Sequence, residues 1–343
     1  MFTIDPNYII CLAAAWLIEI VLGSPKFLPR PSKLATHCAI AAADRVLSVS
    51  ERAANRKNGG NGRAAKLDRH AGIFLAVYVL MFTFIVTAVL LDLSHRLHPA
   101  LYYILTSLII SEAINTRKAA DAAISSRKAN DAAIVKRKTP TDYANGSGDP
   151  HINEKRIIWD LSKNCLDGVY APLLYVTIGI FLGVPAALTA TYRMLAALDG
   201  AVGHKEGEYK NIGWAAAKLD DAANFLPARI CGAVLPLHAA LCGSGARGML
   251  RGFRATRDAH SARSYGHNYK SVNDIWAAAA FAGVLGVSLG GAETRPAGGN
   301  AAEGLAEPGD NETGKAIRLM IAASLSAVIL ICCALAYYAA AAN

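Results

Sequence analysis

The chain has 343 residues, of which 53% are hydrophobic and only 18% are charged, and its mean hydropathy is +0.28. This composition is too apolar for an ordinary soluble protein and is typical of a polytopic membrane protein. The net charge is +9, but the basic residues flank apolar runs and lack interleaved aromatic residues, which argues against binding to nucleic acid. We therefore expect membrane lipid, and no nucleic acid, among the partners of the chain.

Seven apolar runs follow one another along the chain. They cover residues 8–23, 72–91, 101–114, 169–190, 230–246, 276–292 and 317–343. A full helical span needs about 20 residues, a length that only the runs 72–91, 169–190 and 317–343 reach. The shorter runs could be tilted, re-entrant or buried inside the bundle. The sequence thus predicts an all-α fold, a polytopic integral membrane helical bundle with amphipathic and re-entrant helices, about five to seven spans and a single membrane domain over residues 1–343.

The polar segments between these runs differ in charge. Lys and Arg outnumber Asp and Glu by ten to three in residues 24–70, by ten to six in 115–163 and by six to two in 247–275, whereas residues 292–316 hold five acids and two bases. Because basic loops tend to remain in the cytoplasm, we predict that the three basic segments are cytoplasmic and that the acidic loop faces outward.

The segment 115–163 is a polar insert. It contains a near-repeat, RKAADAAI at residues 117–124 and RKANDAAI at 127–134, which predicts an Ala-rich helix without a catalytic role. Residues 139–155 are rich in turn-forming residues and predict a flexible loop.

Seven cysteines contain no CxxC pair, and most of them lie in or beside apolar runs. They are therefore interpreted as small buried hydrophobic residues rather than metal ligands or disulfides. His238 lies in an apolar run and is interpreted as a hydrogen-bonded core histidine.

The most informative motif is GWAAAKLDDAANFLPAR at residues 213–229. On a helix Asp220 and Asn224 share one face, because they are four residues apart. Asp220 and Asp199 are bordered by apolar residues, and burial of a carboxylate is costly unless a function requires it. The alternative is that these carboxylates and Arg229 simply neutralise each other inside the bundle.

Together with Leu198-Asp199, Gly203, Tyr209 and NCLDGVYAP at residues 164–172, this motif resembles the membrane-bound adenosylcobinamide-phosphate synthase family of cobalamin biosynthesis, CobD/CbiB. The resemblance implies a multi-pass protein of the cell membrane. It also implies an ATP-dependent, amide-forming acid–amine ligase that uses Mg²⁺ to join adenosylcobyric acid, a corrinoid substrate, to an aminopropanol (phosphate) arm. Other enzymes of the cobalamin pathway are implied as possible partners.

The resemblance also implies roles for individual residues. The implied catalytic residues are Asp167, Asp199 and Asp220; the implied substrate-binding residues are Asn164, Tyr209, Asn224, Arg229 and Asn273; the implied magnesium ligands are Asp220 and Asp221. Carboxylate oxygens suit Mg²⁺, and an arginine suits phosphate.

Several positions depart from the family pattern. Ser24 and Lys163 stand where the family has acids. These changes keep open a second interpretation, a catalytically silent membrane homologue that binds a corrinoid or a pathway partner. A transporter is a further alternative, although the two halves of the chain show no inverted repeat.

The run 169–190 raises a conflict in topology. If it crosses the membrane once from a cytoplasmic Asn164, then Asp199 and Asp220 fall outside, where ATP is absent. We therefore predict that Gly179, Gly183 and Pro185 let this run bend or re-enter. We also predict that Asp167 and Asp220 approach within about 10 to 15 Å of each other, near enough to share a metal through bridging waters or a corrin-sized substrate.

Overall fold

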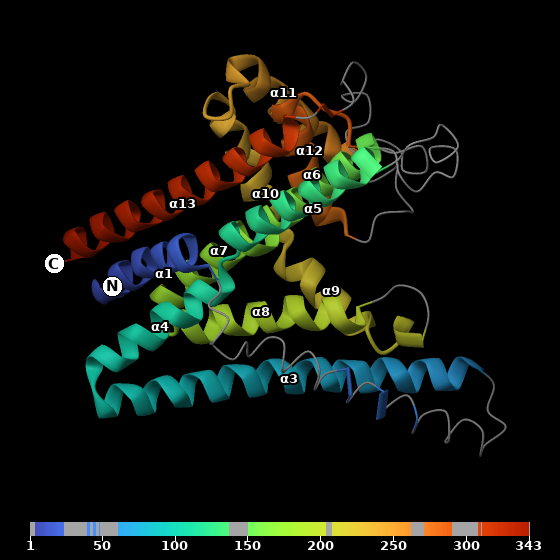
Figure 1. Ribbon diagram of the computed structural model, residues 1–343. Coiled ribbons are helices and arrows are strands. Elements are labelled where there is room, and N and C mark those ends of the chain that lie inside the picture. The colour runs from blue at the N-terminus through green and yellow to red at the C-terminus, as the bar shows by residue number, and fades with distance from the viewer. Residues whose placement is uncertain are drawn as a thin grey trace. The chain divides into compact units, whose positions relative to one another are not determined.

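The structure is a computed structural model that describes residues 4–23, 40–41, 44–45, 48, 61–136, 150–203, 208–261, 271–289, 308–309 and 311–342. Over these ranges the chain forms helices joined by turns, with no β-strand (Figure 1). The predicted all-α fold is therefore confirmed.

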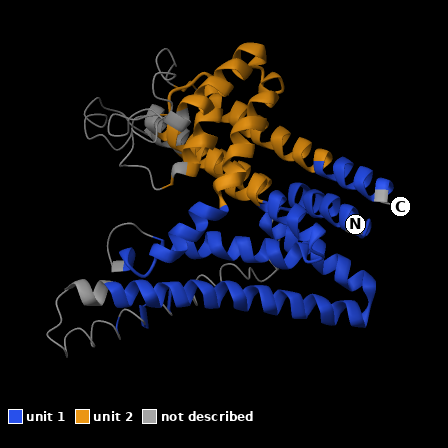
Figure 2. Ribbon diagram, turned by 180° about the vertical axis from the view of Figure 1, so that it is seen from behind, with its two compact units in different colours: residues 1–114, 172–223, 331–343 blue, residues 115–171, 224–330 orange. Residues whose placement is uncertain are grey.

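The helices belong to two compact units, shown in Figure 2. Unit 1 comprises Met1–Ile114, Pro172–Ala223 and Ile331–Asn343, and unit 2 comprises Asn115–Ala171 and Asn224–Leu330. The helices of unit 1 are α1 (Asn7–Leu22), α3 (Asn61–Leu97), α4 (Pro99–Ala113), nearly all of α7 (Ala171–Phe181), α8 (Pro185–Val202), the 3₁₀ helix η3 (Glu208–Lys210) and α9 (Trp214–Ala223). Those of unit 2 are α5 (Thr116–Lys136), α6 (Pro150–Cys165), the π-helix η2 (Leu166–Tyr170), α10 (Phe225–Val234), the 3₁₀ helix η4 (Leu235–Ala240), α11 (Gly245–Ser261), α12 (Val272–Leu285) and the larger part of α13 (Glu312–Ala342). The description of residues 1–343 as one membrane domain stays a prediction.

The core of unit 1 forms where α3, α8 and α9 pack together. Its buried residues are Ala76, Leu198, Val202, Ile212, Ala215 and Ala216. Gly72 of α3 is part of this contact, because a Cβ atom at this position would lie 2.0 Å from the carbonyl oxygen of Ile212. Only glycine allows α3 to approach the backbone ahead of α9 so closely.

The centre of unit 2 is α12, which contacts α6, α10, η4 and α11. Its alanines from Ala277 to Ala280 are completely buried. A Cβ atom on Gly283 would lie 2.6 Å from the carbonyl oxygen of Arg251 on α11, so the two helices meet backbone to backbone. Small residues along α12 therefore serve close helix packing.

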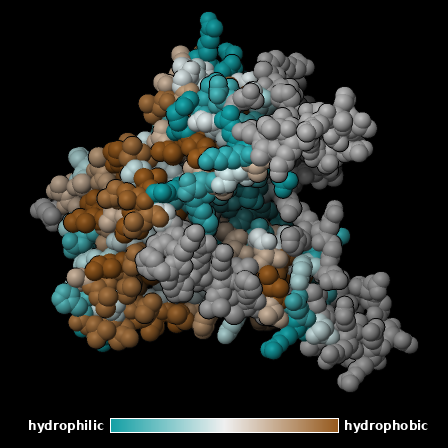
Figure 3. Space-filling model, in the orientation of Figure 1, coloured by the Kyte–Doolittle hydropathy of each residue, from teal (hydrophilic) through white to brown (hydrophobic). Residues whose placement is uncertain are grey.

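Three helical stretches of the described residues are long and apolar enough to cross a membrane. They are Lys66–Leu97, Asn153–Phe181 and Glu312–Ala341. Large apolar side chains cover the outside of two of them, among them Phe74 and Tyr78 on α3 and Leu330 and Tyr337 on α13. Figure 3 shows hydrophobic surface over α13 and around the corner between α3 and α4. The chain is therefore a helical membrane protein. The sequence also contains three runs of full span length, and the count of about five to seven spans stays a prediction.

The run 169–190 is not a single span. Helix α7 ends at Phe181, Gly183 adopts a left-handed φ of 75°, and α8 begins at Pro185. The two helices then run back alongside each other, because the rings of Tyr175 and Tyr192 stack with their centroids 4.7 Å apart. A Cβ atom on Gly179 would lie 2.6 Å from the Cα atom of Pro185. The predicted break is thus confirmed: α7 and α8 form a hairpin, and α8 carries Asp199 back toward the end at which α7 begins.

The polar insert needs one correction. Its near-repeat lies in α5, as predicted, but α6 begins at Pro150, so residues 150–155 are helical rather than part of a loop. Proline is favoured at the start of a helix, where its missing N–H would have no intrahelical partner. The remainder of the predicted loop, up to residue 149, lies outside the described residues.

The opposite orientations predicted for the insert and the acidic loop cannot both be correct. The backbone N–H of Thr313, in the acidic segment, donates to Glu154 Oε1 at 2.9 Å, and the Thr313 hydroxyl bonds the same oxygen. Glu154 belongs to the basic insert, so the two segments lie on one side of the membrane. The insert carries the stronger signal, because orientation follows Lys and Arg while acids contribute little.

The core assignments are largely confirmed. Cys11, Cys165, Cys231 and Cys242 are buried free thiols, whereas Cys333 is exposed and Cys38 lies outside the described residues. His238 is buried, and its Nε2 atom lies 2.5 Å from the hydroxyl oxygen of Ser326 on α13. It is a hydrogen-bonded core histidine, as predicted.

Candidate active site

In unit 1 the predicted residue Asp199 lies in the last turn of α8, where two glycines make room for it. The N–H of Gly203 donates to the carbonyl oxygen of Asp199 at 2.8 Å. A Cβ atom on Gly203 would lie 1.9 Å from Asp199 Oδ1, and one on Gly213 would lie 1.6 Å from the carbonyl oxygen of Val202. Gly203 therefore leaves room for the Asp199 carboxylate at the end of α8, and Gly213 lets the start of α9 approach the same helix end.

Asp220 and Asp221 lie on different sides of α9. Ala216 is buried in the core of unit 1, and Asp220 follows it by four residues, so Asp220 continues the inward face of the helix. Asp221 is turned from it by about 100°. The far end of α9 is held by Tyr175 of the α7–α8 hairpin, whose hydroxyl donates to the carbonyl oxygen of Ala223 at 3.1 Å. This arrangement favours Asp220 over Asp221 as a functional carboxylate.

Tyr209 brings a further carboxylate into unit 1. Its hydroxyl donates to Asp44 Oδ1 at 2.6 Å, and its carbonyl oxygen accepts from the N–H of Gly213 at 2.7 Å. No local pattern marks Asp44, which lies in a basic segment far from any recognised motif. Tyr209 is thus tied to the start of α9, and its substrate-binding role stays a prediction.

In unit 2 the motif NCLDGVYAP forms the junction of α6 with the π-helix η2. Asp167 lies in this π-helical turn, a rare conformation that is frequent at functional sites. Gly168 is required there because a Cβ atom would lie 2.6 Å from the Cβ atom of Asn115. The carbonyl oxygen of Gly168 also accepts from the N–H of Asn115 at 2.8 Å. The side-chain amide of Asn164 donates to the carbonyl oxygen of Asp160 in its own helix, at 2.7 Å.

Arg229 and Asn273 are brought together by the contact of α10 with α12. The Nη1 atom of Arg229 donates to Asn273 Oδ1 at 2.7 Å and to the carbonyl oxygen of Phe225 at 2.8 Å. Its Cζ atom lies 3.6 Å from the ring centroid of Phe225 and 4.9 Å from that of Trp276. Asn224, which is buried, immediately precedes α10. The guanidinium is therefore a fixed cation, held between two rings and an amide.

An ion pair that no local sequence pattern indicates lies beside this group. Lys163 Nζ lies 3.2 Å from Asp274 Oδ2, which joins the end of α6 to the start of α12. The Lys163 side chain is 43% exposed and that of Asp274 only 11%. Ser271 marks the start of α12, because its hydroxyl accepts from the N–H of Asn273. This local pattern does not indicate that Asp274 pairs with the distant Lys163.

The residues of unit 1 and of unit 2 form two separate groups. The first holds Asp199, Tyr209, Asp220 and Asp221, and the second holds Asn164, Asp167, Asn224, Arg229 and Asn273. The approach of Asp167 to Asp220 stays a prediction, because one belongs to each unit.

The carboxylates fit a magnesium ion that arrives with a nucleotide better than a resident metal. Among the described residues no group of three or more His, Cys, Asp or Glu side chains is placed to hold a metal ion. Mg²⁺ commonly binds through one or two carboxylates together with substrate phosphates and waters. Asp220 and the neighbouring Asp221 offer hard oxygen atoms of this kind, and their role as ligands stays a prediction.

Comparison with known proteins identifies the family. The model of the CobD/Cbib protein family matches residues 12–323. A cobalamin biosynthesis protein CobD of Klebsiella pneumoniae is 30% identical over 81% of this chain and 80% of its own length. A CobD of Halalkalibacterium halodurans is 30% identical over 84% and 82%, and a cobalamin biosynthesis protein CbiB of Salmonella typhi is 28% identical over 94% and 96%. No solved structure matches the chain. The chain therefore belongs to the CobD/Cbib family of cobalamin biosynthesis.

Proposed function

We propose that this member of the CobD/Cbib family catalyses ATP-dependent amide formation between a carboxylate of adenosylcobyric acid and the amine of an aminopropanol (phosphate) arm. The observation that carries the proposal is the Arg229 guanidinium, which Asn273 and two aromatic rings hold in one place. A fixed, partly desolvated cation is suited to phosphate groups, which two of the three substrates can contribute.

The reaction divides into two balanced steps. In the first, a carboxylate oxygen of the corrinoid attacks a phosphorus atom of ATP, a mixed anhydride forms, and the phosphorus–oxygen bond to the departing ADP or pyrophosphate breaks. In the second, the amine attacks the activated carbonyl carbon, the amide bond forms, the carbon–oxygen bond to the phosphoryl group breaks, and the amine loses a proton. The chain must therefore bind phosphate, orient two substrates and accept one proton.

Arg229 and Asn273 supply the phosphate-binding part. The carbonyl oxygen of Asn273 accepts from Arg229, so it fixes the direction of the guanidinium without neutralising its charge. Asn224, Asn164 and Tyr209 are proposed to bind the polar groups of the substrates. Asn224 immediately precedes the helix that carries Arg229.

The carboxylates supply the remaining part. Asp220 is proposed as the principal magnesium ligand, with Asp221 as its neighbour, and Asp199 and Asp167 are proposed as the further catalytic carboxylates. Bound Mg²⁺ would neutralise charge on the nucleotide phosphates. A carboxylate near the amine accepts its proton as the amide forms.

The decisive experiment compares Asp220→Asn with Asp221→Asn in the full-length protein reconstituted in lipid nanodiscs. Amide product and nucleotide hydrolysis would be followed by mass spectrometry, together with complementation of a strain that lacks the synthase. We expect Asp220→Asn to lower the rate by about a hundredfold or more, and Asp221→Asn by only a few fold, because only Asp220 continues the inward face of α9. Equal losses at unchanged protein levels would remove the distinction, and loss of the folded Asp220→Asn protein would make its role structural.

A second candidate function is a catalytically silent homologue that binds a corrinoid or a pathway partner. It is favoured by Lys163, which stands where the family resemblance places an acid and which pairs with Asp274. This candidate predicts failure of complementation while a corrinoid still binds, which the absorption spectrum of the corrinoid would report. Product formation by the wild-type protein excludes it.

We further propose that the protein is a multi-pass protein of the cell membrane with residues 24–70 and 115–163 in the cytoplasm. Cysteines introduced at positions 58 and 143 should then resist an impermeant reagent in intact cells and react after lysis. Because Glu154 and Thr313 are hydrogen-bonded, a cysteine near the start of α13 should behave in the same way. Labelling of position 58 or 143 in intact cells contradicts this topology.

A further inference from the structure

Helix α11 is strongly amphipathic, and one side of it is exposed among the described residues. Its other side packs against α10, η4 and α12, in part through small residues. Cβ atoms on Gly248 and Gly252 would lie 2.8 Å from the carbonyl oxygen of Val284 and 2.9 Å from Pro236 Cβ, respectively. This close contact fixes the rotation of α11 about its own axis, and with it the direction of every other side chain on the helix.

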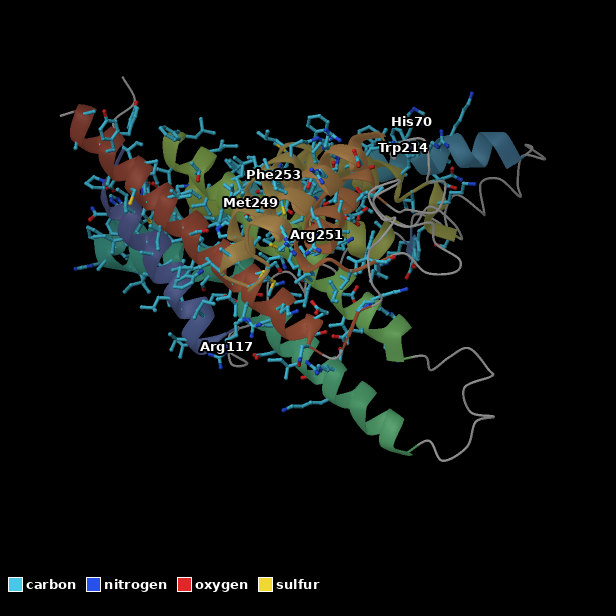
Figure 4. The ribbon with its side chains drawn as sticks, turned by 90° about the horizontal axis from the view of Figure 1, so that it is seen from above. His70, Arg117, Trp214, Met249, Arg251 and Phe253 are labelled. Carbon is cyan, nitrogen blue, oxygen red and sulfur yellow. The ribbon has the colours of Figure 1, made fainter. Side chains whose placement is uncertain are left out.

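The outer side of α11 is divided into an apolar and a basic sector. Met249, Leu250 and Phe253 lie within about 100° of one another around the helix, and Arg247, Arg251 and Arg254 follow next to them. Figure 4 labels Met249 and Phe253 on one side of the helix and Arg251 on the other.

The side chains of both sectors reach the surface. Leu250 is 52% exposed and Phe253 is 36% exposed. Arg247, Arg251 and Arg254 are exposed, and none of the three has an ion pair with a carboxylate among the described residues. A Cβ atom on Gly286, which caps the C-terminus of α12, would lie 2.9 Å from Arg251 Cζ, so the Arg251 guanidinium lies against the end of that helix. Arg247 and Arg254 therefore supply the remaining positive charge beside the apolar area.

The chain immediately before α11 is apolar as well. The helical segment Phe225–Ala240 ends five residues before α11 begins. Leu226 and Leu237 within it are exposed, and so is Leu241, which follows it directly. The apolar sector of α11 and the segment before it in the chain thus both expose large apolar side chains, which favours a lipid surface over a soluble acidic protein.

We infer that α11 lies in the plane of the membrane interface and binds anionic phospholipid. The apolar sector enters the boundary between headgroups and acyl chains, and the arginines reach the lipid phosphates, to which a guanidinium donates in pairs. Each exposed arginine near an anionic surface increases the affinity about fivefold, so neutralisation of two of them decreases it about 25-fold. This inference is independent of the proposed catalytic activity.

The test uses the full-length protein in nanodiscs with a polarity-sensitive fluorophore on Ala246→Cys. Ala246 is exposed and lies between Leu250 and Phe253 around the helix, so both apolar anchors are kept. The parent chain, treated in the same way, gives the background from native thiols. In nanodiscs of phosphatidylcholine with one-third phosphatidylglycerol we expect blue-shifted emission that is quenched by brominated acyl chains and protected from aqueous iodide.

Two variants make the test specific. Arg247→Gln combined with Arg254→Gln should return the fluorophore to water, as should high salt or nanodiscs of phosphatidylcholine alone. The matched control, Arg127→Gln combined with Lys128→Gln on α5, removes the same charge elsewhere and should change nothing. Circular dichroism in each variant reports whether the helices remain folded.

Two results overturn the inference. A fluorophore equally accessible to iodide in both lipid compositions shows that α11 does not enter the interface and leaves its surface to a soluble partner. Equal effects of the α11 variant and the α5 control show that lipid binding depends on the total charge of the protein and not on α11.

Discussion

The contact between Arg229 and Asn273 permits a quantitative test by a double-mutant cycle. A hydrogen bond to a charged donor contributes about 1.5 to 3 kcal/mol, and a cation over an aromatic ring adds about 0.5 to 1 kcal/mol. Arg229→Ala removes the bonds to Asn273 and Phe225 and both ring contacts, so we expect a loss of about 3 to 4 kcal/mol in unfolding free energy. Asn273→Ala removes one of these contacts and should cost about 1.5 to 2 kcal/mol.

Because the two losses share one hydrogen bond, the double variant should be more stable than the sum of the single effects by about 1 to 2 kcal/mol. The assay is reversible unfolding in mixed detergent micelles, followed by far-ultraviolet circular dichroism. Arg96 and Asp92 provide the control, since Arg96 Nε lies 2.7 Å from Asp92 Oδ2 but their side chains are 74% and 63% exposed. Their coupling should stay near about 0.3 to 0.5 kcal/mol. A coupling between Arg229 and Asn273 no larger than this control value refutes the assignment of a fixed, partly desolvated guanidinium.

Two further substitutions test the geometry at other positions. Gly203→Ala should displace the Asp199 carboxylate, which a Cβ atom would approach to 1.9 Å, and should decrease both the unfolding free energy and amide formation. In the control, Gly200→Ala, the new Cβ atom meets nothing within 4 Å and should stabilise α8 by about 0.5 to 1 kcal/mol. Equal unfolding free energies for the two variants contradict the steric argument. Lys163→Met leaves the largely buried Asp274 carboxylate without its cation and should decrease the unfolding free energy by about 1 to 3 kcal/mol. The double variant Lys163→Met/Asp274→Leu should recover most of this loss. If thermal unfolding shows no recovery, the pair does not act as a unit.

Much of the fold follows from local patterns in the sequence. Length and apolarity identify the spans in α3 and α13, and the dense Gly and Pro residues around Gly183 mark the turn between α7 and α8. Such features depend on residues close together in the chain, where backbone conformation and hydrogen bonding are decided locally.

Features that depend on distant partners were missed or assigned wrongly. The ion pair of Lys163 with Asp274 and the bond of Tyr209 to Asp44 join residues more than a hundred positions apart, and no local pattern indicates them. The prediction that the insert and the acidic loop have opposite orientations was wrong for the same reason, since it was inferred from composition while Glu154 bonds the start of α13. The pairing of Arg229 with Asn273 was anticipated only in part, because the resemblance named both residues without giving their contact.

The hydrogen bonds of the turn between α7 and α8 determine whether lipid can surround it. The N–H groups of Leu182, Gly183 and Val184 donate to the carbonyl oxygens of Ile178, Ile180 and Gly179 at 3.1, 3.2 and 2.7 Å. Pro185, the next residue, has no N–H to satisfy. An unbonded peptide N–H in hydrocarbon costs several kcal/mol, so most turns are confined to water. The N–H groups of this turn are all hydrogen-bonded within it, and Leu182 at its tip is 61% exposed. Acyl chains can therefore surround the turn without leaving a backbone N–H unbonded.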